Sequence, residues 1–227
     1  MKFRIALFQV FLILCGCQTN VPNIPVQRNG DETQTDLRNM PRMQSVSVVD
    51  MFTAWGITQS KGELRVTTNG GQTWETVITP HRIPLETVYF LDKQQGWIVD
   101  SETQVLSTKD GGTTWTTVSQ FKTKNDDPSY ISSLQMQFID NQDGWLMETF
   151  SVRRTTDGGL TWKKLFEDDE TSGSPIFLKL LDDVAGYVCT SNGLIFKTVN
   201  QGKTWTKSRV PEAIARHLNF LRSRTAG

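Results

Sequence analysis

Thr108-Lys109-Asp110-Gly111-Gly112-Thr113-Thr114-Trp115 is one of four near-copies of a single pattern, Thr-x-Asp/Asn-x-Gly-x-Thr-Trp. The copies recur at intervals of about 41 to 47 residues. Self-similarity at a period of this size is typical of tandem repeat proteins. The defining positions are, copy by copy, Thr67, Asn69, Gly71 and Trp74; Thr108, Asp110, Gly112 and Trp115; Thr155, Asp157, Gly159 and Trp162; Thr198, Asn200, Gly202 and Trp205.

A second element precedes each copy, an aspartate followed five residues later by an aromatic residue. The pairs are Asp50 and Trp55, Asp92 and Trp97, Asp140 and Trp145, and Asp182 and Tyr187. Together the two elements account for all seven tryptophans of the chain.

The first element has the chemistry of a tight turn between strands. Asp or Asn followed by Gly supplies the positive φ angles that such a turn needs, and the side chain accepts hydrogen bonds from backbone N–H groups. The neighbouring Thr and Trp favour strands. We expect each Trp to fold back over its turn and to bury its ring between neighbouring repeats. These residues are therefore predicted to be architectural.

Around each pair of elements the sequence predicts four short strands. In the second repeat they cover 87–91, 96–101, 103–108 and 114–119, with turn residues between them. The other repeats predict strands at 45–49, 54–58, 63–68 and 73–78; 134–140, 144–149, 151–156 and 161–166; 176–182, 186–191, 194–198 and 204–209. A meander of this length has the size of one propeller blade. The prediction is an all-β propeller with four blades, at about 45–78, 87–119, 132–166 and 175–209.

The turn pattern is similar to the Asp-box, or BNR repeat, of sialidases, sortilin-type receptors and some glucan hydrolases. Its combination with Phe90-Leu-Asp92-Lys-Gln-Gln-Gly96-Trp97, and with the matching stretch 138–145, most resembles the photosystem II stability/assembly factor family of propellers. The resemblance covers about residues 45–209 and implies a scaffold that binds a protein partner. It also implies about seven blades. Four are visible, so we expect an incomplete propeller; a closed four-blade ring, a dimer that completes a larger ring, and a fragment stay open.

Three departures from the repeat pattern stand out. Ala54 replaces the glycine before Trp55, Asn69 and Asn200 replace aspartate in two boxes, and Gln201 replaces the first glycine of the fourth box.

The N-terminal residues predict a lipoprotein. Residues 1–16 combine basic residues with a short apolar run, as in a signal peptide, and the run is too short to span a bilayer. Leu14-Cys-Gly-Cys17 resembles the bacterial lipobox, which implies acylation of the Cys17 thiol and a stable membrane anchor. The alternative for Cys17 is an ordinary buried or disulfide-bonded cysteine. Residues 17–44 then form a polar tether, and the propeller lies on the extracytoplasmic face of the cell membrane or outer membrane.

Charge and cysteine content add little for function. The chain has 24 basic and 24 acidic residues, which gives no support to nucleic-acid binding. With Cys15 in the signal peptide and Cys17 acylated, Cys189 is left alone, and it is expected to be a small buried hydrophobe.

The residues do not support the active site of a sialidase, which would need an arginine triad, a Tyr/Glu pair and an Asp. The chain has three tyrosines, and each fits a strand, a repeat position or a loop. Arg153 and Arg154 are adjacent on a strand, so they cannot both face one pocket. A solvated strand face is predicted for them, with a basic patch as the alternative. We therefore predict a non-enzyme; the alternative is a carbohydrate-binding or sialidase/glycosidase-related protein.

No metal site or cofactor is predicted. His81 and His217 are isolated. The acidic runs 126–127 and 167–170 are expected to be solvated loop charge, with a Ca²⁺ site as the less favoured alternative.

Partner contacts are predicted on the face opposite the Asp-boxes, where the connections 79–86, 122–132 and 167–175 vary between repeats. The candidate residues there are His81, Arg82, Asp126, Asp127, Tyr130, Asp168 and Asp169. The tail 210–227 predicts a short basic amphipathic helix, which fits a membrane contact, a cap on the last blade or a frayed terminus.

Overall fold

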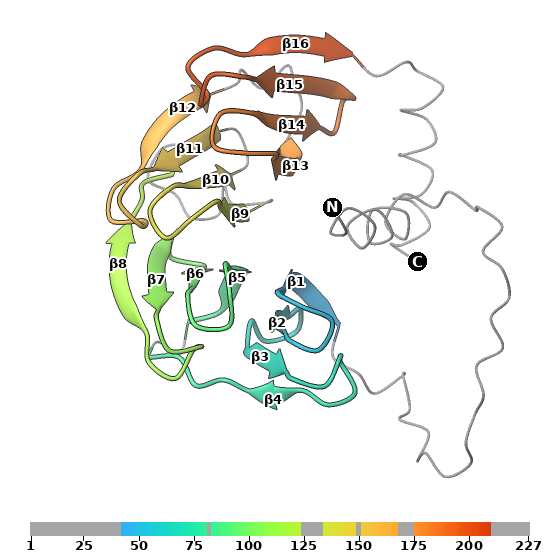
Figure 1. The fold of residues 1–227 in the computed structure, drawn as a ribbon, viewed down its shortest axis with the longest axis vertical. Coiled ribbons are helices and arrows are strands. Elements are labelled where there is room, and N and C mark those ends of the chain that lie inside the picture. Colours follow the sequence, from blue (N-terminus) through green and yellow to red (C-terminus); the bar gives the residue numbers. More distant parts are fainter. Residues whose placement is uncertain (1–41, 81–82, 124–133, 149–150, 168–174, 210–227) are drawn as a thin grey trace, which may run out of the picture. The chain divides into compact units, whose positions relative to one another are not determined.

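The computed structural model describes residues 42–80, 83–123, 134–148, 151–167 and 175–209. These residues form four antiparallel sheets of four strands, and each sheet is a simple meander in chain order (Figure 1). The predicted all-β propeller class is confirmed, with each sheet as one blade.

The strands are short and their bounds repeat from blade to blade. Blade 1 comprises β1 (Met43–Val48), β2 (Ala54–Thr58), β3 (Leu64–Thr67) and β4 (Glu75–Thr76), and blade 2 comprises β5 (Leu85–Phe90), β6 (Gly96–Asp100), β7 (Gln104–Thr108) and β8 (Thr116–Gln120). Blade 3 comprises β9 (Gln135–Phe138), β10 (Gly144–Glu148), β11 (Ser151–Thr155) and β12 (Lys163–Glu167), and blade 4 comprises β13 (Pro175–Leu180), β14 (Gly186–Thr190), β15 (Leu194–Thr198) and β16 (Thr206–Arg209).

Strand ends lie within two residues of their predicted places, with one systematic difference. Every fourth strand begins directly after the Asp-box tryptophan instead of including the Thr-Trp pair. The reason is that the backbone N–H of that threonine is bound by the Asp or Asn side chain, as Thr114 is by Asp110. The pair therefore belongs to the turn.

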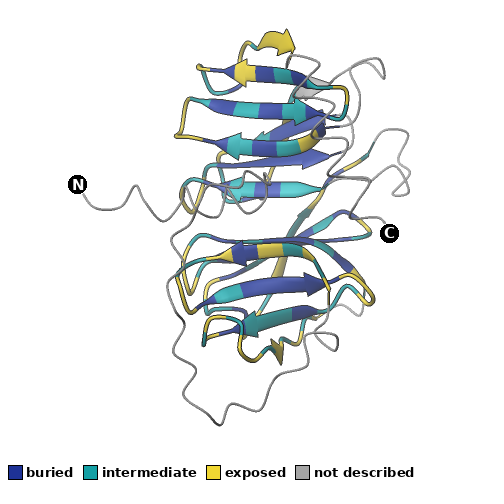
Figure 2. Ribbon diagram, turned by 90° about the vertical axis from the view of Figure 1, so that its right-hand side faces the viewer, coloured by how far each residue is buried: buried dark blue, intermediate teal, exposed yellow. Residues whose placement is uncertain are grey.

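The blades stand side by side, with β1, β5, β9 and β13 along the inner edge and consecutive members in contact (Figure 1). Burial is greatest in the second strand of a blade and least in the fourth, outermost strand. β6 and β10 are buried along their whole length, whereas β16 is exposed throughout (Figure 2).

The hydrophobic core is divided among the three junctions between consecutive blades, with one cluster for each. At the first junction the Trp55 ring of β2 stacks on Phe90 of β5, with centroids 3.7 Å apart. At the second, Trp97 stacks in the same way on Phe138, at 3.6 Å. At the third, Leu180 takes the phenylalanine position in the cluster around Trp145. Each blade is therefore stabilised mainly by its neighbours.

The glycines before Trp97 and Trp145 make room for the phenylalanines with which they pair, Phe90 and Phe138. Gly144 pairs with Phe138 across the strands, and a Cβ on Gly144 would lie 2.5 Å from that ring. In blade 1 the paired residues are Val48 and Ala54. Because valine carries no ring, alanine fits there, which explains this departure from the pattern.

Side chains also bridge the inner strands across the junctions. Ser47 Oγ accepts a hydrogen bond from the backbone N–H of Phe90 at 2.8 Å, and Gln137 Oε1 accepts one from Leu180 at 2.9 Å. The Tyr89 hydroxyl donates to the Phe138 carbonyl at 2.7 Å. Backbone groups that no strand pairs are thus satisfied by the neighbouring blade.

The predicted solvated face for Arg153 and Arg154 is wrong. Arg153 is buried; its Nε donates to Glu148 Oε1 at 2.6 Å and its Nη2 to the Lys122 carbonyl at 2.6 Å, toward blade 2. Arg154 lies on the other face, where it pairs with Asp143 and donates to Gln201 of blade 4. The two arginines do point in opposite directions, but each lies at a junction between blades, and burial drives it to a partner.

Cys189 is half-buried, not fully buried as expected. Desolvation raises the pKa of its thiol, so the thiol form is favoured at neutral pH. None of the described residues forms a helix long and apolar enough to cross a membrane.

Candidate binding site

The Asp-box residues come together within each turn. Asp110 accepts three hydrogen bonds, from the Thr114 hydroxyl at 2.6 Å, the Thr114 backbone N–H at 2.8 Å and the Thr108 hydroxyl at 2.8 Å. These bonds favour the charged form and lower the pKa of Asp110 to about 2. Thr108 Oγ1 in turn accepts from the Gly112 N–H at 2.9 Å. The carboxylate is fully used in closing the turn.

The asparagine boxes keep the same geometry with one bond reversed. Asn69 Oδ1 accepts from the Thr73 N–H at 3.0 Å, but Asn69 Nδ2 donates to the Thr73 hydroxyl at 2.9 Å. In the fourth box Gln201 adopts the positive φ of 64° that glycine has in the other boxes.

Three of the box tryptophans, Trp115, Trp162 and Trp205, pack half-buried against the junction clusters. Trp74 belongs to none of the clusters formed by the described residues. Nor do the described residues contain a group of His, Cys, Asp or Glu arranged to hold a metal ion.

The predicted partner-binding residues lie outside the described ranges. They are His81, Arg82, Asp126, Asp127, Tyr130, Asp168 and Asp169. The same holds for residues 1–16, Cys17 and the tail 210–227. These assignments therefore remain predictions.

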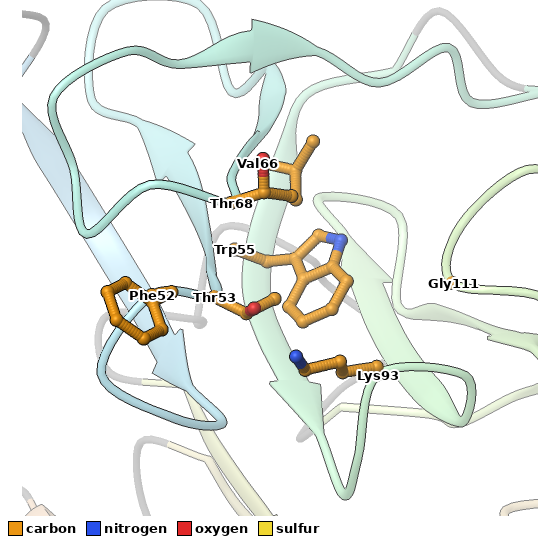
Figure 3. A pocket seen from close by; sticks show the side chains of 7 residues that line it. All are labelled: Phe52, Thr53, Trp55, Val66, Thr68, Lys93 and Gly111. Carbon is orange, nitrogen blue, oxygen red and sulfur yellow. The ribbon is translucent and has the colours of Figure 1, made fainter.

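A pocket lies on the Asp-box side, at the junction of blades 1 and 2, and has a volume of about 460 Å³. That volume falls within the range of small-ligand sites. Figure 3 shows the Trp55 indole between Thr68 and Val66 on one side and Lys93 on the other. The lining residues are Phe52, Thr53, Trp55, Val66, Thr68, Lys93 and Gly111.

An aspartate turn fixes the rim of the pocket. Asp50 Oδ1 accepts from the backbone N–H groups of Phe52 at 2.9 Å and Thr53 at 2.8 Å, and Oδ2 pairs with Lys93 Nζ at 2.8 Å. Lys93, followed by the Phe52 N–H, holds the pKa of Asp50 well below its usual range. The ion pair joins the two blades and places the ammonium group at the mouth of the pocket.

The interior of the pocket is mostly apolar. Trp55 is buried with its ring stacked on Phe90, Val66 is half-buried, and Phe52 is 57% exposed. The indole N–H of Trp55 has no hydrogen-bond partner, whereas that of Trp97 at the next junction donates to the Gly158 carbonyl at 2.9 Å. The pocket can therefore take an apolar side chain whose flanking carbonyl or carboxylate groups meet Lys93.

The sequence does not predict this pocket, because the expected partner contacts lie on the opposite face. One signal was available. The turn after Asp50 carries the apolar pair Met51-Phe52. The same two positions are polar in the next blades, with Lys93-Gln94 in blade 2 and Asn141-Gln142 in blade 3. Exposed apolar residues in a turn that is otherwise polar often mark a contact surface.

Comparison with known proteins identifies related sequences and folds. Residues 66–227, more than half of the chain, match the family model described as photosynthesis system II assembly factor YCF48. The photosystem II assembly lipoprotein Ycf48 of Synechococcus sp. (strain CC9902) is 29% identical over 146 residues, which cover 63% of this chain and 42% of that protein. The chain thus spans about two fifths of the length of this relative.

Solved structures share the blade arrangement. A structure of YCF48 bound to D1 peptide matches with a TM-score of 0.55 and 24% identity, over 75% of this chain and 54% of that one. A GH74 enzyme from Niastella koreensis matches with a TM-score of 0.57 and 16% identity, over 73% of this chain and 30% of that one. At these identities the likeness concerns the fold alone.

Proposed function

Because the chain belongs to the photosynthesis system II assembly factor YCF48 family, we propose that it is a non-enzymatic scaffold that binds a peptide segment of a protein partner in the pocket between blades 1 and 2. The observation that carries the proposal is the exposed aromatic Phe52 beside a tethered cation, Lys93, over an apolar interior. Aromatic residues that become fully buried near the centre of an interface contribute much of the affinity.

A relative supports a peptide as the partner. A protein of the same family has been solved with a D1 peptide bound. By that analogy the segment is a peptide of a photosystem II protein, with an apolar side chain in the pocket and an acceptor group at Lys93.

Catalysis is not part of the proposal. The GH74 neighbour is an enzyme, but it shares only the fold, and one fold serves many functions. The carboxylate at the rim, Asp50, is bound to Lys93 and to two backbone N–H groups, so it is held as a structural anion rather than as a proton carrier.

A lipid anchor at Cys17 completes the proposed function. The Synechococcus relative is named a lipoprotein, and Cys17 follows an apolar leader in this sequence. The scaffold would then present its pocket at the extracytoplasmic face of a membrane.

Peptide binding can be measured by fluorescence anisotropy with a labelled D1 peptide and a scrambled peptide. We expect Phe52→Ala to weaken binding of the D1 peptide by about tenfold, or ~1.4 kcal/mol. Leu160→Ala is a matched control, because Leu160 is equally exposed, at 57%, but lies in the turn of blade 3. Equal affinity of Phe52→Ala and the unmodified chain, or equal binding of the scrambled peptide, would refute the proposal.

The anchor has a separate test. In cells fed a labelled fatty acid, the chain should incorporate label and sediment with membranes, and Cys17→Ser should abolish both. Retention of label in Cys17→Ser would show that acylation occurs elsewhere, and absence of label in the chain without substitutions would show that there is no lipid anchor.

A further inference from the structure

Every blade has two sides that take part in junctions. We call the side that packs on the preceding blade the N-side face, and the side that packs on the following blade the C-side face. In blade 2 the N-side face carries Phe90 and Val88, which pair across the strands with Gly96 and Ile98. The C-side face carries the second-strand tryptophan and the residue after the first strand, such as Trp97 and Leu91.

The N-side face of blade 1 is open. Val46 and Val48 occupy the same register positions as Val88 and Phe90, yet they are 51% and 64% exposed. Their equivalents in the other blades are all buried: Val88, Phe90, Met136, Phe138, Leu178 and Leu180. Trp74, whose equivalents pack on the preceding blade's cluster, lies on this same side without a cluster.

The C-side face of blade 4 is open as well. Leu181 is 61% exposed, whereas its equivalents Val49, Leu91 and Ile139 pack against the next blade's cluster. Tyr187 holds the tryptophan position and is half-buried, and so is Cys189. The residues equivalent to Cys189 are all fully buried: Ile57, Val99 and Met147.

We propose that these faces bind each other in a second copy of the chain. Blade 4 of each copy packs on blade 1 of the other, and two sets of four blades close a ring of eight. Propellers with up to about eight blades are common closed rings. Two copies related by a two-fold axis make this head-to-tail contact twice, and the two contacts use all four open faces. The assembly therefore closes as a dimer and does not grow into a filament.

The three junctions within one copy are examples of a C-side face packed on an N-side face. Blade 4 supplies an open C-side face, and blade 1 supplies an open N-side face. Tyr187 would lie over Val48 of the partner copy as Trp55 lies over Phe90. Lys179 stands where Tyr89 stands in blade 2, opposite the second-strand aromatic. Since the Tyr89 hydroxyl donates to the Phe138 carbonyl, the Lys179 ammonium can donate to the equivalent carbonyl, that of Val48.

A charged residue on the N-side face does not oppose the contact. Arg65 pairs in register with Gly56, as Arg153 pairs with Leu146. Arg153 crosses its junction and donates to the Lys122 carbonyl of the preceding blade at 2.6 Å. An arginine at this position is therefore compatible with a packed junction.

Sedimentation of the purified full chain in a mild detergent tests the proposal. We expect the mass of two copies for the chain without substitutions. Val48→Asp and Leu181→Asp should each give monomers, because a carboxylate would be buried at the contact. Both side chains are exposed in one copy, so the variants should keep the circular dichroism of the folded blades. Ile78→Asp, at a site 86% exposed and outside both faces, should remain dimeric.

Mixing the two variants distinguishes head-to-tail from symmetric pairing. A chain with Val48→Asp keeps an intact C-side face, and a chain with Leu181→Asp keeps an intact N-side face. Together they should form dimers through one intact contact. If Leu181→Asp alone stays dimeric, blade 1 binds blade 1 and the proposal is wrong. A monomeric unmodified chain, or assemblies larger than two copies, would also overturn it.

Cys189 provides a readout that needs no substitution. Its rate of reaction with a maleimide, followed by peptide mass mapping, should fall as the chain concentration rises, and should stay high in Val48→Asp. Protection that is equally strong in Val48→Asp would mean that another part of the same chain covers blade 4, which would refute the dimer. Val48 does not line the pocket between blades 1 and 2, so failure of peptide binding and failure of dimerisation are separable.

Discussion

An aspartate and an asparagine close the same turn in different blades of this molecule. Asp110 Oδ2 accepts a hydrogen bond from the Thr114 hydroxyl, whereas Asn69 Nδ2 donates one to the Thr73 hydroxyl. A threonine hydroxyl can do either, because it carries one proton and two lone pairs. The turn therefore requires a short side chain with two polar atoms, and its charge is secondary at neutral pH.

Charge does matter in acid. The pKa of Asp110 is lowered to about 2 in the folded chain, from about 3.9 in an unfolded one. Because the pKa of Asp110 is lower in the folded chain, the ionised carboxylate stabilises the fold at pH values above the pKa of the unfolded chain. This stabilisation is lost as the pH falls toward the pKa of the folded chain. We expect Asp110→Asn to reduce the loss of Tm between pH 5 and pH 2.5, measured by thermal unfolding.

The control for this prediction is Asp110→Ala, which should lower Tm at every pH, because the Thr114 N–H loses its acceptor. A fall of Tm in Asp110→Asn as steep as in the unmodified chain would show that acid acts on other sites.

At the scale of strands, the pairing of phenylalanine with glycine couples the inner strand to the second strand. Phe138 lies between Trp97 of the preceding blade and the Cα of Gly144. Blade 1 is the first blade among the described residues, and it carries Val48 and Ala54 at these two positions.

This comparison predicts strong coupling between the two positions. Gly144→Ala should destabilise the fold by about 1–3 kcal/mol, because the new methyl group overlaps the Phe138 ring. Adding Phe138→Val removes the overlap, so the double variant should be more stable than the sum of the single effects by about 1 kcal/mol or more. The coupling is measured by urea unfolding of the chain without substitutions, the two single variants and the double variant. Strictly additive changes in the free energy of unfolding would contradict the packing described.

A buried ion pair makes a second prediction at this scale. Glu148 and Arg153 lie on paired strands, and both are buried at the junction of blades 2 and 3. Glu148→Ala leaves the guanidinium buried with a carbonyl as its remaining partner and should cost about 3–5 kcal/mol. The double variant Glu148→Leu, Arg153→Met should cost much less, since no charge remains. Urea unfolding would contradict this account if Glu148→Ala cost under ~1 kcal/mol.

At the scale of the whole molecule, the four described blades of one copy are joined by three junctions in series. Each blade contributes its own hydrogen bonds and its contacts with neighbours only, so unfolding need not be a single step. Trp97→Ala removes the central stack on Phe138, a change that typically costs ~3–5 kcal/mol. We expect it to separate the molecule into two pairs of blades that unfold independently.

Hydrogen exchange with mass spectrometry can follow the two pairs. In Trp97→Ala, peptides of blades 1 and 2 should exchange at a rate different from those of blades 3 and 4. In the control Trp145→Ala, studied like Trp97→Ala in the monomeric Val48→Asp chain, only blade 4 should lose protection, because Trp145 belongs to the junction of blades 3 and 4. Uniform loss of protection over all blades in Trp97→Ala would mean that the molecule unfolds as one unit.

The sequence predicts what lies within one repeat. Strand ends follow from the turn chemistry of Asp, Asn and Gly, and for this reason they lie within two residues of the observed ones. Contacts between repeats are different, because they join residues about 40 positions apart. The environment of Arg153 depends on Lys122, and the pocket combines Phe52 with Lys93. No local pattern specifies such pairs, although the apolar Met51-Phe52 turn was a visible hint.

The register of the junctions has a consequence for how such a chain can change over evolutionary time. Every junction packs the second-strand aromatic of one repeat on a first-strand apolar residue of the next, so a gene that loses or duplicates one full period keeps this packing at the remaining junctions. Removal of blade 2, for example, would bring Trp55 opposite Phe138, the same pair of residue types that it has now with Phe90. Blade number can therefore change by recombination between repeats, without passing through a form whose core is mismatched.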